Sequence, residues 1–344
     1  MKKIAIVIQD AYSYAGTENV CNFMTDSLGE NNHIEIISLC GSGSPFYPFN
    51  KINKINSFHD KWFKYIRIIG FLKKNKFDIV YVISMGKLSF IFMVFSKVLL
   101  LSKIKKISCE HVSFRSFSKY IRLLKLWALK GYDEVIVLTS EDEVFLKERS
   151  VKTKKIYNPI TFKNHIYKVE EKRVLAVGRL VFQKGYDDLL LIWKSFVKNN
   201  PSWTLDIAGD GELFDHLQQV RKSFGIENSV NFLGKIEDVD YFYKRADLFV
   251  MTSKYEGLPL SLLEAKSWSI PSVAFDCPTG PSEIINNSID GFLVPPENIK
   301  LFIERLDYLA KNNEIRNEFR KKTLITSEKF AKEKIILEWL QTTN

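Results

Sequence analysis

The sequence is poor in the residues that build disulfide frameworks and metal sites. It holds five histidines and four cysteines in 344 residues. The cysteines are scattered, without a CxxC pair or a spacing typical of metal ligands: Cys21, Cys40, Cys109 and Cys277. Disulfide frameworks need a dense set of cysteines in a short chain. We therefore expect reduced thiols, a cytosol-like compartment and no metal or other cofactor.

Long apolar runs are also missing. The most apolar stretch, residues 88–102, is interrupted by Lys97 and is shorter than the roughly 20 residues of a membrane span. It predicts a buried helix. The chain begins MKKIAIVIQD, in which two lysines precede only a short apolar run. A secretory signal has a longer apolar core, so this segment predicts a first β-strand.

Positive charge is unevenly distributed. Residues 1–157 contain 25 basic and 14 acidic side chains, a net charge of +11, whereas the remaining residues sum to −1. Within the first half, residues 51–130 contain 18 basic and 3 acidic side chains. A one-sided basic surface attracts anionic lipids, nucleic acid or a diphosphate substrate. The alternative is a bias toward lysine that leaves only solvated faces.

Two basic segments, 61–76 and 119–130, mix Lys and Arg with aromatic and aliphatic residues at helical spacing. Helices of this kind can lie in a membrane interface. They can equally cover a sheet with their lysines outward. The sequence leaves both interpretations open.

Short apolar, β-branched runs alternate with helix-length amphipathic segments along the whole chain. The predicted strands are residues 3–8, 33–39, 77–84, 105–109, 134–139, 173–177, 204–208, 230–233, 248–252, 272–275 and 291–294. Such alternation predicts parallel sheets with helices on both faces. Eleven strands are too many for one ordinary sheet. We therefore predict two Rossmann-like domains.

The boundary between these domains is expected within residues 151–167, where Asn158-Pro159 interrupts regular structure. The predicted division is 1–157 for the first domain and 158–325 for the second. Residues 326–344 are expected to form a terminal helix that can cross back to the first domain.

Ligands of such sheets bind outside the carboxyl ends of the strands. After the first strand, Gly16 and Thr17 lie in a small-residue turn that opens a helix, which suits an anion but can be a simple helix start. In the second half, Arg179 leaves a strand and Lys184 opens the next helix. This pair predicts a diphosphate clamp, or else two solvated cations. Residues 208–212 predict a tight turn with Asp210 capping the following helix.

The most specific segment is residues 253–265. Glu256 is predicted on the loop after a strand, and Glu264 two turns into the following helix. Gly257 permits a close backbone approach to a ligand, and Pro259 is tolerated in a first helical turn. Two carboxylates so placed can each bind a vicinal diol, one on a donor sugar and one on a ribose. Favourable charge at a helix N-terminus is the alternative.

The spacing of Glu256 and Glu264 matches the E-x7-E motif of the retaining glycosyltransferase family four. Further segments follow that family's order: Gly178-Arg179, residues 183–185, 209–212, 232–234 and 277–283. In the first half, Ala15-Gly16-Thr17-Glu18 resembles the family's glycine-pair loop, with Ala15 replacing one glycine. Glu110-His111 resembles the Glu-His pair that lies near the reacting sugar in the family.

The resemblance implies a GT-B fold, in which two Rossmann-like domains face each other across a cleft and the C-terminal helix returns to the first. The first domain would bind the acceptor and the second the nucleotide sugar. The catalytic residues would be His111, Glu256, Arg179 and Lys184. The donor-binding residues would be Gly16, Thr17, Arg179, Lys184, Gly209, Leu233, Gly234, Glu256, Gly257, Leu258, Leu260 and Glu264.

The resemblance also implies a retaining reaction with same-face attack, in which the departing phosphate takes the acceptor's proton. We expect no metal requirement, because Arg179 and Lys184 supply the positive charge. Asp238-Val239-Asp240 matches the DxD pattern of metal-dependent transferases, but it is predicted to begin a surface helix.

The sequence says least about the acceptor. The basic, aromatic-rich stretch and a cytosolic UDP-sugar donor favour an undecaprenyl-diphosphate-linked acceptor at the inner membrane face. This would place a hexosyl or N-acetylhexosaminyl transfer in bacterial O-antigen or capsule assembly. Alternatives are a soluble sugar or protein acceptor, or a non-catalytic nucleotide-sugar binding module. Nucleic acid is disfavoured, because aromatic stacking motifs are missing.

Overall fold

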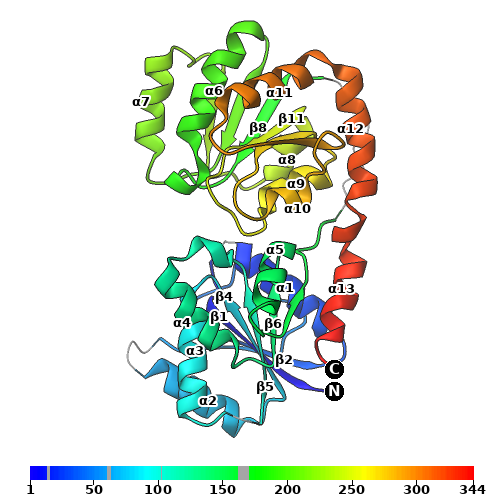
Figure 1. Cartoon of the computed structure of the whole chain (residues 1–344). Helices are drawn as coiled ribbons and strands as arrows, with labels where there is room; N and C mark the ends of the chain where they lie inside the picture. Colours follow the sequence, from blue (N-terminus) through cyan, green and yellow to red (C-terminus); the bar gives the residue numbers. More distant parts are fainter. Residues whose placement is uncertain (14–15, 60–62, 102, 162–169) are drawn as a thin grey trace. The chain divides into compact units, whose positions relative to one another are not determined.

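The computed structural model describes residues 1–13, 16–59, 63–101, 103–161 and 170–344. The chain forms two compact units, which Figure 1 shows in sequence colours. Unit 1 consists of Met1–Asn158 and Lys332–Asn344, and unit 2 of Pro159–Ala331. Each unit is built around one parallel sheet.

Unit 1 has a seven-stranded sheet in the order β3-β2-β1-β4-β5-β6-β7. Its strands are β1 (Lys3–Asp10), β2 (His33–Cys40), β3 (Lys54–Ser57), β4 (Ile79–Ser84), β5 (Lys105–Glu110), β6 (Glu134–Val137) and β7 (Thr153–Lys155). Its helices are α1 (Gly16–Leu28), α2 (Lys64–Lys74), α3 (Lys87–Val98), η1 (Phe114–Ser116), α4 (Lys119–Leu129), α5 (Ser140–Lys147) and α13 (Lys332–Gln341).

Unit 2 has a six-stranded sheet in the order β10-β9-β8-β11-β12-β13. Its strands are β8 (Arg173–Val177), β9 (Thr204–Ala208), β10 (Val230–Gly234), β11 (Leu248–Met251), β12 (Ser272–Phe275) and β13 (Gly291–Val294). Its helices are η2 (Phe182–Lys184), α6 (Tyr186–Asn199), α7 (Phe214–Phe224), α8 (Val239–Arg245), α9 (Leu260–Ser267), α10 (Pro281–Ile284), α11 (Ile299–Lys311), α12 (Asn313–Thr326) and η3 (Glu328–Phe330).

The eleven predicted strands all form, and the structure adds β3 and β7. These are the two outer strands of unit 1, and each pairs in parallel with one neighbour. Their sequences, KINS and TKK, lack the apolar run of a strand that is covered on both faces. This is why sequence patterning does not detect them.

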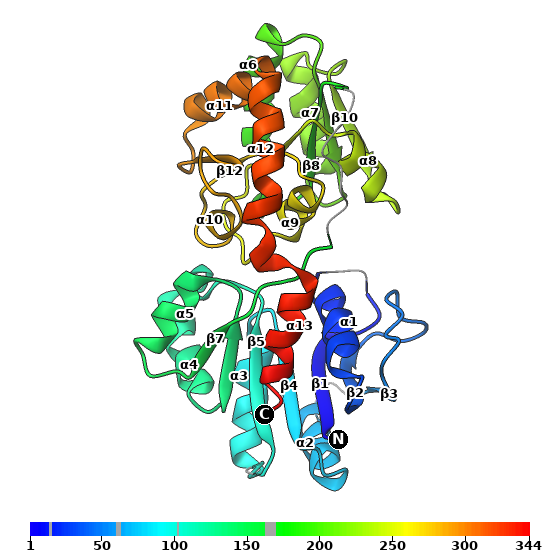
Figure 2. The same ribbon diagram turned by 90° about the vertical axis from the view of Figure 1, so that its right-hand side faces the viewer.

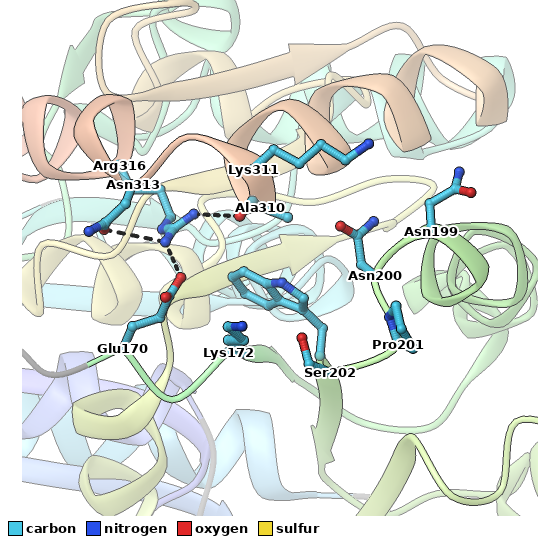
Figure 3. Close-up of a pocket in the computed structure, with 11 residues that line it drawn as sticks. Glu170, Lys172, Asn199, Asn200, Pro201, Ser202, Ala310, Lys311, Asn313 and Arg316 are labelled. Carbon is cyan, nitrogen blue, oxygen red and sulfur yellow. Dashed lines mark hydrogen bonds and ion pairs between the residues drawn. The ribbon is translucent and has the colours of Figure 1, made fainter.

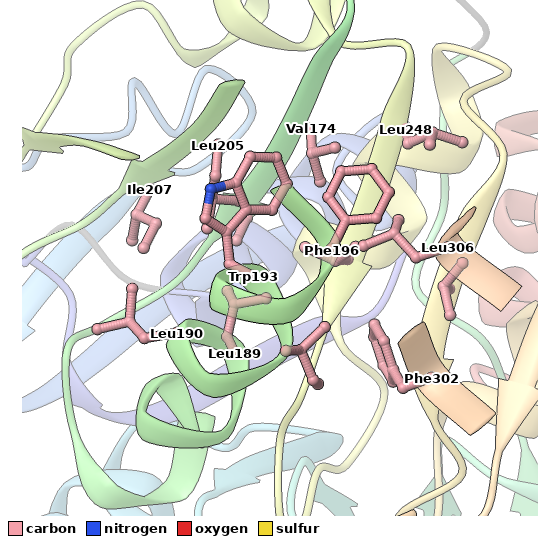
Figure 4. Packing of buried hydrophobic residues seen from close by; sticks show 14 of the residues in the cluster. Val174, Leu189, Leu190, Trp193, Phe196, Leu205, Ile207, Leu248, Phe302 and Leu306 are labelled. Atoms are coloured by element: carbon pink, nitrogen blue, oxygen red, sulfur yellow. The ribbon is translucent and has the colours of Figure 1, made fainter. Parts of the chain in front are cut away.

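The core of unit 2 is packed around α6. Trp193 and Phe196 are fully buried, with ring centroids 5.0 Å apart, and strand and helix side chains surround them (Figure 4). The indole N–H of Trp193 donates to the hydroxyl of Ser229 at 3.0 Å. A buried indole therefore has its polar atom satisfied, and α6 is fixed firmly beside β8, whose carboxyl end supports the site described below.

The C-terminal helix α13 packs on α1, within unit 1 (Figure 2). Trp339 is buried and meets the ring of Tyr81 edge-on at 6.1 Å. The hydroxyl groups of Tyr81 and Thr342 lie 2.6 Å apart. The predicted return of the C-terminal helix to the first unit is confirmed.

The two basic helices differ in which side chains they bury. In α2, Ile68, Ile69 and Leu72 are buried and Lys73 is exposed, as expected for a helix that covers a sheet. In α4, Lys119 and Lys130 are exposed, but Lys125 is 2% exposed, so the interpretation with outward lysines is wrong at this residue. No helix among the described residues is long and apolar enough to cross a membrane.

The strand orders place a reversal at the centre of each sheet. In unit 2, β8 is followed outward by β9 and β10, and the chain then returns so that β11 pairs with the other side of β8. The loops after β8 and β11 therefore both lie at the carboxyl edge next to this reversal, which is where ligands of such sheets bind. Unit 1 has the same reversal between β1 and β4.

Candidate functional site

Three glycine turns follow neighbouring strands at the carboxyl edge of unit 2. The amide of Gly178 donates to Ala208 at 2.9 Å, and that of Gly209 donates to Gly234 at 2.9 Å. Gly209 has φ of +144°, and a Cβ atom there would lie 2.0 Å from the Gly178 carbonyl oxygen. Only glycine fits at this position. The turns therefore form a continuous backbone platform, with Leu233 and Gly234 as the last two residues of β10.

Two cations lie beside this platform. Arg179 directly follows Gly178, is exposed, and has no ion-pair or hydrogen-bond partner for its side chain among the described residues. Lys184 ends η2, and Gly185 next to it has φ of +64°. A Cβ on Gly185 would lie 2.2 Å from the Thr252 carbonyl oxygen, so this turn packs directly on the end of β11. The packing brings Lys184 to the loop that carries Glu256.

Lys184 and Glu256 form an ion pair that joins the turn after β8 to the loop after β11. Their Nζ and Oε1 atoms are 2.7 Å apart, and the side chains are 16% and 8% exposed. Two further contacts join the same segments: Lys254 donates its amide to the Gln183 carbonyl at 2.8 Å, and Gln183 Nε2 donates to the Tyr255 carbonyl at 2.9 Å. Lys184, predicted to bind the diphosphate, and Glu256, predicted to bind the donor sugar, are therefore in direct contact.

The segment after Glu256 presents backbone donors. The amides of Gly257, Leu258 and Leu260 donate to no acceptor among the described residues, and α9 begins at Leu260. The loop after β12 supports this segment from behind. Thr279 donates its hydroxyl to the Glu256 carbonyl at 2.6 Å, and a Cβ on Gly280 would lie 2.4 Å from the Gly257 carbonyl oxygen. Free amides at a helix start are suited to an anion or to sugar hydroxyl groups.

Glu264 is held by a residue that sequence reasoning missed. The hydroxyl of Tyr243, on α8, lies 2.8 Å from the Glu264 carboxylate and 3.0 Å from the Ser261 carbonyl. Tyr243 is buried and Glu264 is partly exposed. The tyrosine hydroxyl therefore orients the carboxylate, which is still partly exposed to solvent. The sequence gives no signal for this contact, because a tyrosine on a helix face resembles any other core aromatic.

The predicted capping role of Asp210 is wrong. Helix α7 begins at Phe214, with Leu213 at its N-cap. The Asp210 carboxylate instead accepts from the amide of Gly211 at 2.8 Å, and its carbonyl accepts from Leu180 at 2.9 Å. A longer turn precedes the helix, because the β9 turn must first pack against the turn after β8. Asp238, by contrast, caps α8 by accepting from the Tyr241 amide.

The predicted residues of unit 1 also lie at a carboxyl edge. Gly16 and Thr17 open α1, where the Thr17 hydroxyl donates to Glu18 at 2.8 Å. Tyr14 and Ala15 lie outside the described residues. Glu110 ends β5, is buried, and accepts from Ser108 at 2.8 Å. It also forms an ion pair with Lys125, a partner that the sequence pattern did not indicate.

His111 follows Glu110 directly. Its ring is partly exposed, but Nε2 is shielded from solvent and has no hydrogen-bond partner among the described residues. Burial lowers the pKa of His111 to about 4, an effect that the charge of Glu110 opposes. The imidazole is therefore neutral at physiological pH. It can donate or accept one hydrogen bond but contributes no positive charge.

A separate polar hollow of about 290 Å³ lies at the opposite, amino edge of the unit 2 sheet (Figure 3). Its lining includes Lys172 and Ser202, which precede β8 and β9. The guanidinium of Arg316 on its wall pairs with Glu170 and donates to the carbonyl of Ala310 at 2.8 Å. These internal contacts engage its main charged group, so we assign the hollow a structural role.

No group of three or more His, Cys, Asp and Glu side chains suited to a metal ion occurs among the described residues. The groups on the segments that follow the strands at the carboxyl edge of unit 2 are instead two cations, two carboxylates and backbone amides without an acceptor among the described residues. This set is suited to a ligand that carries both anionic oxygens and hydroxyl groups.

Solved structures share this fold. The HepE protein of Anabaena, in complex with UDP and glucose, superimposes with a TM-score of 0.83 at 17% identity, covering 100% of this chain and 99% of that one. The lipopolysaccharide outer core galactosyltransferase WaaB gives a TM-score of 0.78 at 22% identity, covering 99% and 100%. The predicted GT-B fold is confirmed.

Sequence comparison identifies the family. Residues 159–324 match the family described as Glycosyl transferases group 1. The chain is 33% identical to the amylovoran biosynthesis glycosyltransferase AmsD of Erwinia amylovora over 352 residues, which cover 98% of this chain and 99% of the relative. A Campylobacter jejuni N-acetylgalactosaminyltransferase, named for a PP-undecaprenol-linked saccharide, is 28% identical over 65% of this chain and 63% of its own length. The protein belongs to the group 1 glycosyltransferases.

Proposed function

We propose that the protein transfers a hexose or N-acetylhexosamine from a UDP-sugar to a lipid-diphosphate-linked saccharide, with retention of anomeric configuration, in the assembly of a bacterial surface polysaccharide. One observation carries the donor part of this proposal: Lys184 is paired with Glu256 beside an unpaired Arg179, at the carboxyl edge of unit 2. The pair places a cation and a sugar-binding carboxylate side by side.

Each chemical group of the UDP-sugar donor is assigned residues of unit 2 that bind it. Arg179 and Lys184 bind the diphosphate, the first through a planar fork and the second through a point charge. Glu264, oriented by Tyr243, accepts from the ribose hydroxyl groups. Glu256 and the amides of Gly257, Leu258 and Leu260 hold the transferred sugar. Backbone groups of Gly209, Leu233 and Gly234 face the base. The presence of UDP and glucose in the HepE structure supports a donor of this class.

The reaction breaks the bond between the anomeric carbon and the diphosphate. Negative charge grows on the leaving phosphate, and fixed cations stabilise it, each contributing roughly 2.7–4 kcal/mol in the transition state. The acceptor hydroxyl attacks the same face of the sugar, and its proton passes to the departing phosphate. Side-chain cations supply the charge that a metal would otherwise provide. His111, being neutral, hydrogen-bonds the sugar or the acceptor without adding charge.

A lipid-linked acceptor is supported by the names of relatives and by charge. The Campylobacter relative is named for a PP-undecaprenol-linked saccharide, and AmsD for amylovoran biosynthesis. The basic excess of residues 51–130 lies in unit 1, which we assign to the acceptor. Both observations favour a diphosphate-bearing acceptor at a membrane surface, with the enzyme bound peripherally to its inner face.

A panel assay tests the proposal. The enzyme is incubated with UDP-glucose, UDP-galactose and their N-acetyl counterparts, each with a polyprenyl-diphosphate-linked saccharide in detergent. We expect one donor to give a glycolipid product whose new linkage is axial by NMR. A product formed only on a free sugar or a protein would overturn the lipid acceptor. Tight UDP-sugar binding without turnover on any acceptor would indicate a binding module instead.

A further inference from the structure

Helix α4 of unit 1 buries Ala128 and Leu129 against the core together with a lysine, and it exposes a second apolar face to solvent. Tyr120, Leu123 and Trp127 are 72%, 67% and 48% exposed, and Ile121 and Leu124 are also exposed. The side chain of Lys125, on the opposite face, is 2% exposed. Residues 120, 123, 124 and 127 share one face by helical spacing. We call this face the α4 apolar face.

A buried ion pair fixes this orientation. Lys125 pairs with Glu110, whose side chain is 5% exposed, and its Nζ lies 4.6 Å from the centre of the Phe117 ring. Rotating α4 to bury Leu123 and Leu124 would expose Lys125 and leave the Glu110 carboxylate buried without its cation, which is strongly unfavourable. The outward position of the apolar face is therefore a consequence of a specific internal contact, and not of loose packing at the surface.

Cations surround the α4 apolar face. Lys119 and Lys130 flank it on the helix, and Lys97 of α3 lies 4.2 Å from the centre of the Trp127 ring. No acidic residue occurs between Glu110 and Asp133. Helix α4 lies beside α3 on the outside of the sheet (Figure 1). Exposed aromatic and leucine side chains with lysines at their border are typical of helices that lie in a lipid interface.

We propose that α4 inserts its apolar face into the interface of an anionic lipid bilayer, with Lys119, Lys130 and Lys97 at the level of the phosphate groups. The cations around the α4 apolar face indicate which partner covers it. A second copy of the chain would dock by two-fold symmetry and bring two acid-free, cationic surfaces together, which repel. An anionic bilayer matches both the cations and the apolar side chains. This inference rests on the membrane-borne acceptor proposed above and identifies the residues that would reach the lipid.

Trp127 allows a direct test. The other tryptophans of the described residues, Trp193, Trp203, Trp268 and Trp339, are buried. Full-length protein is mixed with vesicles of phosphatidylglycerol and phosphatidylethanolamine, with and without bromine-labelled acyl chains. We expect a blue shift of the emission and its quenching by the bromolipid, both lost in Trp127→Phe.

A variant pair separates insertion from simple charge attraction. Leu123→Ser/Leu124→Ser removes apolar side chains at constant charge, and we expect its vesicle affinity to fall by roughly tenfold or more. The control Leu337→Ser alters a residue of α13 that is 62% exposed, and should bind like the wild type. Far-UV circular dichroism should be unchanged in both, because the altered side chains are at the surface.

Equal vesicle binding by Leu123→Ser/Leu124→Ser and the wild type would overturn the proposal. So would bromolipid that leaves Trp127 emission unquenched in vesicle-bound protein. A concentration-dependent dimer that the double substitution abolishes would assign the face to a second copy instead. None of these measurements needs sugar transfer. Turnover with a short, water-soluble acceptor analogue therefore tests the transferase independently, and failure of either proposal can be distinguished from failure of the other.

Discussion

Lys184 and Glu256 contact each other at 2.7 Å, which joins the turn after β8 to the loop after β11 on the two sides of the strand-order reversal. Without a donor, the lysine neutralises a carboxylate that is almost wholly removed from solvent. When a diphosphate binds, the same ammonium has a second anion beside it. Lys184 therefore stabilises the architecture of the site in addition to its proposed role in the chemistry, whereas we propose that the exposed, unpaired Arg179 acts on the ligand alone.

This difference predicts distinct outcomes for the two cations. Arg179→Ala should lower turnover by about 10²–10³-fold and leave the free energy of unfolding unchanged. Lys184→Ala should lower turnover similarly, but it also leaves the Glu256 carboxylate buried and unpaired, at a cost of about 1–3 kcal/mol. Steady-state kinetics and urea unfolding of both variants measure the two effects.

A double substitution provides the control for this prediction. Lys184→Ala/Glu256→Ala removes both charges, so it should regain much of the stability lost in Lys184→Ala while remaining inactive. Near-wild-type turnover in both single variants would contradict the diphosphate clamp.

The contact between Tyr243 and Glu264 leads to a prediction about donor binding. Tyr243→Phe removes the hydroxyl group that orients the carboxylate, and one hydrogen bond to a charged group is worth about 1.5–3 kcal/mol. We expect the KM for the donor to rise roughly tenfold or more, with kcat little changed, because the ribose is remote from the bond that breaks. Tyr308→Phe, at a 43% exposed position on α11, is the matched control. An unchanged KM in Tyr243→Phe would refute the ribose role of Glu264.

We expect activity to persist in excess EDTA, because in the proposed mechanism Arg179 and Lys184 carry the charge of the leaving phosphate. The DxD-like pair supports this expectation. Asp238 caps α8, and Asp240 accepts from the indole N–H of Trp268 at 3.2 Å. Initial rates in EDTA, and after addition of Mg²⁺ or Mn²⁺, are the measurement. Loss of activity in EDTA that either metal restores would show that the side-chain cations are insufficient.

The buried Nε2 of His111 makes stability depend on pH. The folded-state pKa is about 4 against an ordinary 6.5. Protonation below pH 6.5 therefore favours the unfolded chain, and stability is lost as the pH falls from 6.5 toward 4. Between pH 7.5 and pH 5 the free energy of unfolding of the wild type should fall by about 2 kcal/mol more than that of His111→Gln, in which this position does not titrate. Urea unfolding of both proteins at the two pH values measures this difference, and parallel losses would refute it.

How much the sequence predicts depends on whether a contact is local. Glu256 and Glu264 could be placed because a strand, a glycine turn and a helix start follow one another within a few residues. The same locality identified Arg179 and Lys184 as neighbours. The pairing of Lys184 with Glu256 could not be predicted, because it joins residues 72 positions apart.

Helix α4 shows that a local pattern fails when a non-local contact decides which side chain is buried. Its sequence, KYIRLLKLWAL, invites a pattern in which leucines face the core and lysines face water. At Lys125 tertiary structure overrides this pattern, since Glu110 at the end of β5 offers a buried carboxylate with which Lys125 forms an ion pair. Hydrophobic periodicity alone cannot detect such a partner. Tyr243 was missed for the same reason, because its role depends on the contact of its hydroxyl with Glu264, which lies on another helix.

The uneven charge of the chain predicts binding to anionic membranes through unit 1. Residues 1–157 have a net charge of +11 and the rest of the chain −1, a division that a general need for solubility would not produce. Each Lys or Arg close to an anionic surface contributes about 1 kcal/mol, and salt screens this attraction over about 10 Å. Lys64→Glu/Lys73→Glu/Lys119→Glu/Arg122→Glu should therefore release the protein from phosphatidylglycerol vesicles in a flotation assay.

The matched control reverses four exposed lysines of unit 2, namely Lys198, Lys222, Lys300 and Lys321. This control changes the net charge by the same amount. It should still float with the vesicles if the position of the charges matters, and it should be released from them if only the total charge matters. Both variants should bind UDP like the wild type, because Arg179, Lys184 and Glu264 are unchanged. A wild type that floats equally on anionic and neutral vesicles at low salt would contradict the electrostatic part of membrane binding, and a soluble acceptor would then become the leading hypothesis.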